Sequence, residues 1–179
     1  MKSKLLLKIS IFLGLFYTPS SVIAGLQQNV DKKSELPLQS IDYILIKKKE
    51  RILELYSHHE LIKTYFIALG FNPIGHKEQE GDGKTPEGKY IISYKNPNSK
   101  FYLSLKISYP SEKDRQNAAS KRISLGGDIM IHGLGKQFGF LGRIHVIRDW
   151  TLGCVAVTNT EIKEIYDVVQ IGTVVEIQP

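Results

Sequence analysis

Residues 149–159, Asp-Trp-Thr-Leu-Gly-Cys-Val-Ala-Val-Thr-Asn, contain Cys154, the only cysteine of the 179-residue chain. A single cysteine cannot form a disulfide within the chain, so this thiol has no structural bridge to make. Gly153 permits a tight turn in which successive backbone N–H groups point at one place, as an oxyanion hole requires. The stretch therefore suits a nucleophile, although a lone buried cysteine is often only a small apolar residue.

A histidine upstream completes a candidate pair. His132 ends the apolar segment 128–131, where a strand would hold its ring rigidly, and Gly133 leaves the neighbouring backbone uncrowded. A cysteine attacks as the thiolate, and an imidazole beside it both lowers the thiol pKa and carries the proton. We therefore predict that Cys154 is a nucleophile and His132 its general base.

The other histidines have plainer interpretations. His145 is either a second ring in the site or, as we favour, a hydrogen-bonded histidine on the wall of a lid over it. His58 and His59 are adjacent on a predicted turn, so their rings point apart, and no cysteine or carboxylate spacing completes a metal site. We expect no metal and no cofactor.

The first 24 residues have the anatomy of an export signal. Three lysines up to Lys8 precede the apolar run 9–17, residues 18–21 interrupt it, and Val-Ile-Ala at 22–24 precedes Gly25. The run is shorter than the about 20 residues of a membrane span, and no cysteine follows it for a lipid anchor. We predict a signal peptide over 1–24 and a protein exported to the periplasm or cell envelope, with an uncleaved anchor as the alternative.

The charge of the mature chain is mild. The whole chain has 24 Lys+Arg and 18 Asp+Glu, and residues 1–24 hold three lysines and no acid, which leaves 21 − 18 = +3. This balance does not support nucleic-acid binding, and the mature length suits one domain with a real core.

Short apolar runs separated by turn residues follow a polar spacer over 25–40 and indicate a mostly β domain over 41–179. We predict strands at 41–46, 51–56, 61–68, 89–94, 101–107 and 174–177. One or two short helices are expected: one at 111–121 capped by Ser111, and one that begins with the capping box Thr158/Glu161 and is stopped by Gly172.

The order and spacing of these segments resemble the L,D-transpeptidase catalytic domain (YkuD) family. Ile-His-Gly at 131–133, followed by Thr-Leu-Gly-Cys at 151–154, resembles its active-site signature, in the form of one subgroup. Gly-Asp-Gly-Lys-Thr-Pro-Glu-Gly at 81–88 resembles an upstream turn of the family, and 172–177 its closing strand. The resemblance spans about 41–179 and implies mixed β-sheets, sandwich-like or barrel-like, around a groove for peptidoglycan stem peptides.

The resemblance also implies a chemistry. The family's cysteine attacks the bond between the third stem residue and D-Ala, releases D-Ala, and passes the thioester-bound stem to an amine. Carried over, Cys154 is the nucleophile and His132 the base. The Gly133 carbonyl orients the imidazole, and the N–H groups of Gly153 and Cys154 form the oxyanion hole.

Two positions depart from the commoner pattern: Leu152 stands where many members have His, and Ala156 where many have Arg. This leaves open which groups hold the substrate carboxylate and the acyl acceptor. Arg148 and Arg143 are the candidates, because a guanidinium suits a carboxylate. The remaining substrate-binding candidates are Thr151 and Trp150, the latter either lining the groove or packing in the core.

Three functions follow in order of preference. The first is a cell-wall transferase whose acceptor is another stem, a lysine of an envelope protein or a free D-amino acid. The second is a hydrolase with the same acyl-enzyme, acting as carboxypeptidase, endopeptidase or amidase, because Ala156 and Thr158 resemble a branch of the family that contains hydrolases. The third is a non-catalytic cell-wall binding protein, against which the presence of both Cys154 and His132 argues.

Overall fold

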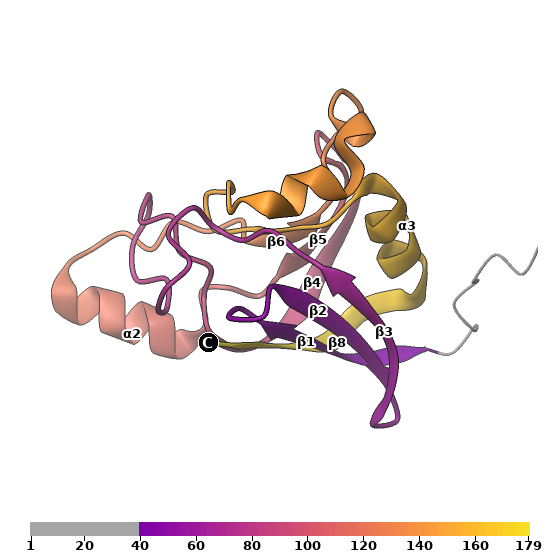
Figure 1. Cartoon of the computed structure of the whole chain (residues 1–179). Coiled ribbons are helices and arrows are strands. Elements are labelled where there is room, and N and C mark those ends of the chain that lie inside the picture. The colour runs from indigo at the N-terminus through magenta and orange to yellow at the C-terminus, as the bar shows by residue number, and fades with distance from the viewer. Residues whose placement is uncertain (1–39) are drawn as a thin grey trace, which may run out of the picture. The chain divides into compact units, whose positions relative to one another are not determined.

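The computed structural model describes residues 40–179 (Figure 1). The predicted signal peptide and nearly all of the predicted spacer lie outside these residues. The elements are, in chain order, β1 (Ile41–Lys47), β2 (Ile52–Ser57), β3 (Glu60–Phe66), β4 (Gly88–Ser99), β5 (Tyr102–Ile107), α2 (Glu112–Lys121), β6 (Met130–His132), the 3-10 helix η1 (Gly139–Ile147), β7 (Val155–Ala156), α3 (Asn159–Val168) and β8 (Val169–Gln178).

The strands form one mixed sheet in the order β3-β2-β1-β8-β4-β5-β6-β7. The pairs β1–β8 and β6–β7 are parallel, and the other pairs are antiparallel. Bridges from Ala68 to Ala156 and from Gly70 to Thr151 join the segment after β3 to β7 and the cysteine turn. The sheet therefore curls until its two edges meet, which confirms the predicted mostly β fold class.

The sheet curls at strand β4, which belongs to both halves of the sheet. One half contains β3, β2, β1 and β8, and the other contains β5, β6 and β7. The first residues of β4, from Gly88 to Ile91, pair with β8, and the rest of the strand pairs with β5. The concave side is filled by fully buried aliphatic side chains contributed by strands from both halves: Ile44, Leu53, Ile92, Leu105, Ile131 and Val175. Helix α3 packs on β5 and β6 and supplies buried Ile162 and Ile165.

Both predicted helices are present, and each begins with a capping box. Ser111 and Asp114 form one at α2, and Thr158 and Glu161 form the other at α3, with the hydroxyl and carboxylate satisfying free backbone N–H groups. The prediction that Gly172 stops α3 was wrong. The helix ends at Val168, because Val169 pairs with Ile41 in the sheet, and Gly172 lies in the bulge that follows.

Segment 139–147 was not predicted as an element. It forms η1, interrupted at Gly142, whose φ of 49° and ψ of −133° are not helical. Figure 1 shows η1 in orange above β5 and β6. The strands predicted at 89–94 and 174–177 are longer in the structure, because pairing with neighbours extends both. Within residues 40–179, no helix has the length and hydrophobicity needed to cross a membrane.

Candidate active site

Strands β6 and β7 bring the predicted nucleophile and base together. They pair in parallel with Ile131 opposite Val155 and His132 opposite Ala156, so Cys154 directly precedes the strand that lies beside His132. The Val157 N–H donates to the His132 carbonyl at 3.0 Å and extends this pairing. The two side chains therefore come from neighbouring strands of the same short ladder.

The His132 ring is fully buried and holds one tautomer. Its Nδ1–H donates to the Gly133 carbonyl oxygen at 2.6 Å. Because a carbonyl only accepts, the proton is on Nδ1, and Nε2 keeps the lone pair that a base needs. Burial lowers the pKa of His132 to about 4, so the ring is neutral at pH 7.

Two aromatic side chains fix the imidazole in place. Phe101 stacks on it with ring centres 4.2 Å apart and planes inclined by 23°, and Trp150 contacts it edge-on at 5.9 Å. Trp150, a predicted substrate-binding residue, thus lies against the His132 ring. The sequence predicted Phe101 only as a residue of the strand at 101–107. Its contact with His132 depends on the pairing of β5 with β6, which the sequence does not reveal.

Asn159 is a positioning residue that the sequence did not reveal. Its side chain accepts from the Leu134 N–H at 2.8 Å and donates to the Gly135 carbonyl at 3.0 Å. A Cβ at Gly133 would lie 2.6 Å from Asn159 Oδ1, so glycine is required for this close approach. Asn159, the first residue of α3, thereby fixes the loop whose Gly133 carbonyl accepts from the His132 ring.

The Cys154 thiol is half-buried and protonated at rest. Its Sγ lies 3.5 Å from the Asp128 carbonyl oxygen, and burial raises the pKa of the Cys154 thiol above its ordinary value. A neutral thiol beside a neutral imidazole differs from a preformed ion pair. In such an arrangement the thiol reacts as a nucleophile only if a base removes its proton in the same step.

The turn before the cysteine is shaped by Thr151. Its hydroxyl accepts from the Gly153 N–H at 3.1 Å and donates to the Cys154 carbonyl at 2.7 Å. Thr151 is buried with both bonds internal, so the structure contradicts its predicted place against substrate. The Gly153 N–H is likewise engaged, which removes it from the predicted oxyanion hole. The Cys154 N–H has no hydrogen-bond acceptor within residues 40–179.

The turn is fastened to the segment after β3 and to the loop before β4. The N–H groups of Trp150 and Thr151 donate to the Leu69 carbonyl at 3.1 and 3.0 Å. Gly153 has φ +130°, and a Cβ there would lie 2.6 Å from the Lys84 carbonyl oxygen. The loop at 81–88 that the sequence singled out thus supports the turn from behind.

The two candidate arginines occupy different places. Arg148 is exposed at the end of η1, two residues before the turn begins at Trp150, and forms no ion pair with any residue of the described part of the chain. Arg143 lies 3.6 Å from Glu161 and above the ring of Phe66, beside the start of α3. The structure places Arg143 against α3 and does not bring it to the cysteine turn.

The departures from the commoner motif are also visible. Leu152 is 75% exposed and offers no hydrogen-bonding side chain beside Cys154. Ala156 is completely buried in the β6–β7 ladder. Neither position supplies a group that would hold a charged substrate.

The other four histidines of the chain are His58, His59, His76 and His145. His58 and His59 are exposed on the turn between β2 and β3. His76 accepts from the Glu87 N–H through Nδ1 and pairs with Asp114 through Nε2 at 3.1 Å, so neither nitrogen is free to act as a base. His145 is buried in η1, and neither of its ring nitrogens has a hydrogen-bond partner among residues 40–179, which contradicts the prediction of a satisfied wall residue.

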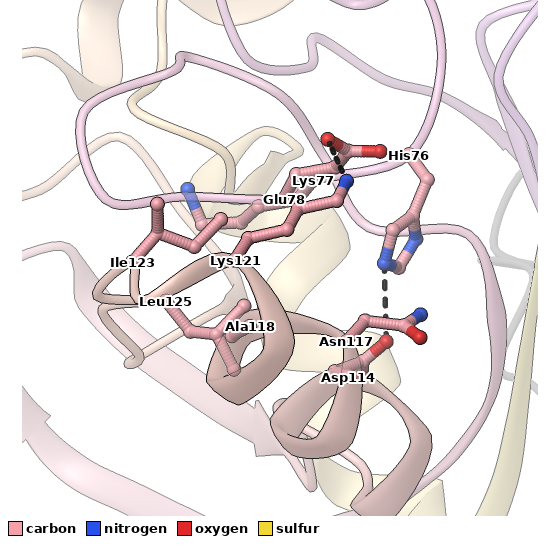
Figure 2. A pocket seen from close by; sticks show the side chains of 9 residues that line it. All are labelled: His76, Lys77, Glu78, Asp114, Asn117, Ala118, Lys121, Ile123 and Leu125. Carbon is pink, nitrogen blue, oxygen red and sulfur yellow. Dashed lines mark hydrogen bonds and ion pairs between the residues drawn. The ribbon is translucent and has the colours of Figure 1, made fainter.

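A small cavity of about 30 Å³ lies between α2 and the segment 76–78. His76 is one of the side chains that line it (Figure 2). Two ion pairs among the lining residues, His76–Asp114 and Lys121–Glu78, tie α2 to that segment. None of the candidate site residues lines it, so it serves the attachment of α2. No group of three or more His, Cys, Asp or Glu side chains that would hold a metal occurs in residues 40–179.

Comparison with known proteins places the chain in one family. The sequence model of the L,D-transpeptidase catalytic domain (YkuD) matches residues 41–177. The chain is 31% identical over 185 residues to a protein of Escherichia coli strain K12 named "Putative L,D-transpeptidase YafK", with 96% of this chain and 67% of that protein covered.

Two solved structures share the fold. The helical cell shape determining protein Pgp2 from Campylobacter jejuni superposes with a TM-score of 0.58 at 28% identity, covering 78% of this chain and 48% of that one. Bd1075 from Bdellovibrio bacteriovorus gives a TM-score of 0.55 at 23% identity, covering 77% and 48%. The chain thus spans about half the length of these two proteins. By its sequence and its fold, this chain belongs to the L,D-transpeptidase catalytic domain (YkuD) family.

Proposed function

We propose that this protein is an exported enzyme that forms a Cys154 thioester with peptidoglycan stem peptides and transfers the stem to an amine. The observation that carries the proposal is the neutral His132, with Nδ1–H fixed on Gly133 and Nε2 free, on the strand next to Cys154. A buried neutral imidazole beside the lone thiol is what general-base activation needs.

In the first half-reaction His132 Nε2 takes the thiol proton as Cys154 Sγ attacks the carbonyl carbon of the third stem residue. The Cys154 N–H stabilises the oxyanion that develops. When the tetrahedral intermediate collapses, the bond to D-Ala breaks and His132 returns the proton to the departing amine. The stem stays on the enzyme as a thioester.

In the second half-reaction an amine attacks the thioester carbonyl and loses a proton to His132. The carbon–sulfur bond breaks, and the proton passes to the leaving thiolate, which restores the resting thiol. Family membership supports a peptidoglycan substrate. The name of the C. jejuni relative, a cell shape determining protein, supports a role in remodelling the wall.

Hydrolysis is the second candidate, and one observation favours it. The exposed Leu152 and the buried Ala156 provide no ring or cation for holding a charged peptide acceptor, and water needs neither. In that case the same thioester would be cleaved by water, and the product would be a tripeptide stem.

The test is incubation of the purified mature protein with disaccharide-tetrapeptides, followed by mass spectrometry. Transfer predicts cross-linked dimers or amine adducts, and hydrolysis predicts disaccharide-tripeptides. The matched control is Cys154→Ala, which removes one small, half-buried side chain and should fold with the parent's circular dichroism spectrum. Release of D-Ala by folded Cys154→Ala would refute the thioester mechanism for both candidates.

A further inference from the structure

The segment 138–152, which contains η1 and leads into the cysteine turn, exposes an unusual amount of apolar surface. Soluble proteins usually expose large apolar side chains singly, and a group of them marks an interaction site. Of the fourteen large hydrophobic side chains exposed within residues 40–179, six lie in this one segment. We call these six side chains the η1 surface: Phe138, Phe140, Ile144, Ile147, Trp150 and Leu152.

The local geometry turns these side chains outward together. In a 3-10 helix residues three apart lie on the same side, so Ile144 and Ile147 share the outer side of η1, while His145 between them is buried on the inner side. Phe138 and Trp150, from the two ends of the segment, line the same apolar cavity, of about 290 Å³. In Figure 1, η1 is the outer layer above β5 and β6. The η1 surface is therefore one face of the molecule.

The free charges within this part of the sequence have one sign. Lys136 and Arg148 are exposed, and neither forms an ion pair with any residue of the described part of the chain. Between residues 129 and 160 the only acidic side chain is Asp149, and its carboxylate is engaged by Arg51. The η1 surface therefore carries free cations among its apolar side chains and no free carboxylate from the same stretch.

This combination decides between three kinds of occupant. A second copy of the chain would bring Lys136 and Arg148 against the same cations of its partner, which like-charge repulsion opposes. A protein partner needs a surface of matching shape, whereas Phe140 and Ile147 protrude, with exposed fractions of 81% and 82%. A bilayer needs no matching shape, because its headgroup region takes up protruding apolar side chains while its phosphates meet the cations. An anionic bilayer fits the η1 surface best.

We propose that the η1 surface docks the protein on an anionic lipid bilayer, with its apolar side chains in the headgroup region and with Lys136 and Arg148 against lipid phosphates. The domain lies on the membrane in this way and does not cross it. Leu152 belongs to the η1 surface and stands two residues before Cys154, so docking holds the cysteine turn close to the bilayer. This proposal goes beyond the proposed function and does not depend on the thioester chemistry.

The first measurement is vesicle flotation with the mature chain, residues 25–179, which lacks the apolar run at 9–17. The vesicles are either pure phosphatidylcholine or an equimolar mixture with phosphatidylglycerol. The mature chain should bind the mixed vesicles about tenfold more strongly, because two cations meet anionic lipid. Added salt should weaken this binding, since it screens the attraction.

Trp150 reports which face of the protein meets the lipid, because it is the only tryptophan of the chain and belongs to the η1 surface. Its fluorescence should shift to shorter wavelength on the mixed vesicles and should be quenched by lipids brominated near the headgroup end of their acyl chains. Binding through any other face would leave Trp150 in water and unquenched, and that result would overturn the proposal.

Paired variants test the apolar side chains. Phe140→Ser combined with Ile147→Ser should lower the partition coefficient on mixed vesicles at least about tenfold, because two large apolar groups no longer enter the bilayer. The matched control combines Ile74→Ser with Ile171→Ser, which removes two exposed isoleucines outside the η1 surface. This control should change binding less than about twofold. All variants should keep the parent's circular dichroism spectrum, since the replaced side chains are exposed.

A second pair tests the cations. Lys136→Glu combined with Arg148→Glu should abolish the preference for phosphatidylglycerol. The control, Lys49→Glu combined with Lys113→Glu, changes the net charge equally at exposed lysines outside the segment and should keep most of that preference. Equal losses in the two pairs, or no vesicle binding by the parent, would overturn the proposal. So would a dimer in analytical ultracentrifugation that is lost in the Phe140→Ser/Ile147→Ser variant, because a second copy would then be the occupant.

Discussion

Arg51 and Asp149 join the start of β2 to the residues that lead into the cysteine turn. The guanidinium donates to Asp149 Oδ2 through Nε at 3.0 Å and through Nη2 at 2.8 Å. The other carboxylate oxygen, Oδ1, accepts from the Leu69 N–H at 2.9 Å. A single carboxylate thus secures three elements around the turn, two of them far from it in the sequence.

Asp149→Ala should lower the free energy of unfolding by about 1–3 kcal/mol, because it leaves a guanidinium and a backbone N–H without their partner. Asp167→Ala is the matched control. It removes an exposed carboxylate that pairs with Lys163 on the surface of α3, and it should cost less than about 0.5 kcal/mol. The measurement is urea denaturation of the mature protein. Equal losses in the two variants would show that Asp149 does not secure the turn.

The pH dependence of catalysis should follow the buried base. His132 must be neutral to accept the thiol proton, and its pKa lies at about 4, below the ordinary 6.5, because burial disfavours the charged ring. The acidic limb of kcat/KM should therefore fall well below pH 6.5, and activity should be lost only as the pH drops toward about 4. A limb near 6.5 would mean that His132 is solvated in the working enzyme.

The His132→Ala variant tests the same role through the thiol alone. Alkylation of Cys154 by iodoacetamide near neutral pH should be slower than in the parent, because the thiol loses the group that takes its proton. His59→Ala serves as control. If His132→Ala left the pH profile of alkylation unaltered, the base would have to be sought elsewhere, with His145 next.

The turn itself should tolerate no side chain before the nucleophile. Gly153→Ala combines a φ of +130° with a Cβ 2.6 Å from the Lys84 carbonyl, and we expect a loss of stability of more than about 1 kcal/mol. Gly127→Ala is the control, since a Cβ there meets nothing within 4 Å and its φ is not left-handed. Thermal melting of both variants measures the difference. Similar melting temperatures would show that the turn adjusts freely.

Of the two arginines, only Arg148 is free to meet a substrate carboxylate. Arg148→Ala should raise the KM for tetrapeptide more than it lowers kcat, because a contact present in both ground and transition states is lost. Arg143→Ala should have little effect, since its guanidinium is engaged by Glu161 and Phe66. The effect of Arg148→Ala should shrink on amidated stems. Identical kinetics on both substrate forms would leave Arg148 as a surface residue.

Features that depend on only a few neighbouring residues were predictable from the sequence. The two helix starts are local, because each capping box needs only a hydroxyl and a carboxylate three residues apart. The strand at 41–46 follows from a short apolar run bounded by turn residues. Residue types and a motif pointed to Cys154 and His132 as a pair, and the pairing of β6 with β7 brings their backbones together. The Gly133 carbonyl came from the family resemblance, and the structure has it 2.6 Å from His132 Nδ1.

Features that depend on contacts between distant segments were not predictable. Val169 leaves the helix because Ile41 is its sheet partner, and nothing near Val169 in the sequence says so. Asn159 and Asp149 are polar residues of ordinary appearance whose partners are defined by the fold. His145 was predicted to be a hydrogen-bonded histidine, and only the packing of η1 shows that its nitrogens have no partner in the part of the chain that the structure describes.

The bridge between Ala68 and Ala156 also affects how readily the Cys154 thiol is oxidised. Contacts between residues so far apart in a chain tend to form late in folding, because the loop between them must close first. Until then Cys154 is an ordinary accessible thiol, and sulfenic and sulfonic acids form most readily from exposed thiolates. Closure of the sheet leaves the Cys154 thiol half-buried and protonated, so folding should protect it from oxidation. Peroxide should therefore oxidise Cys154 more slowly in the native protein than in urea, as mass spectrometry of the two states would reveal.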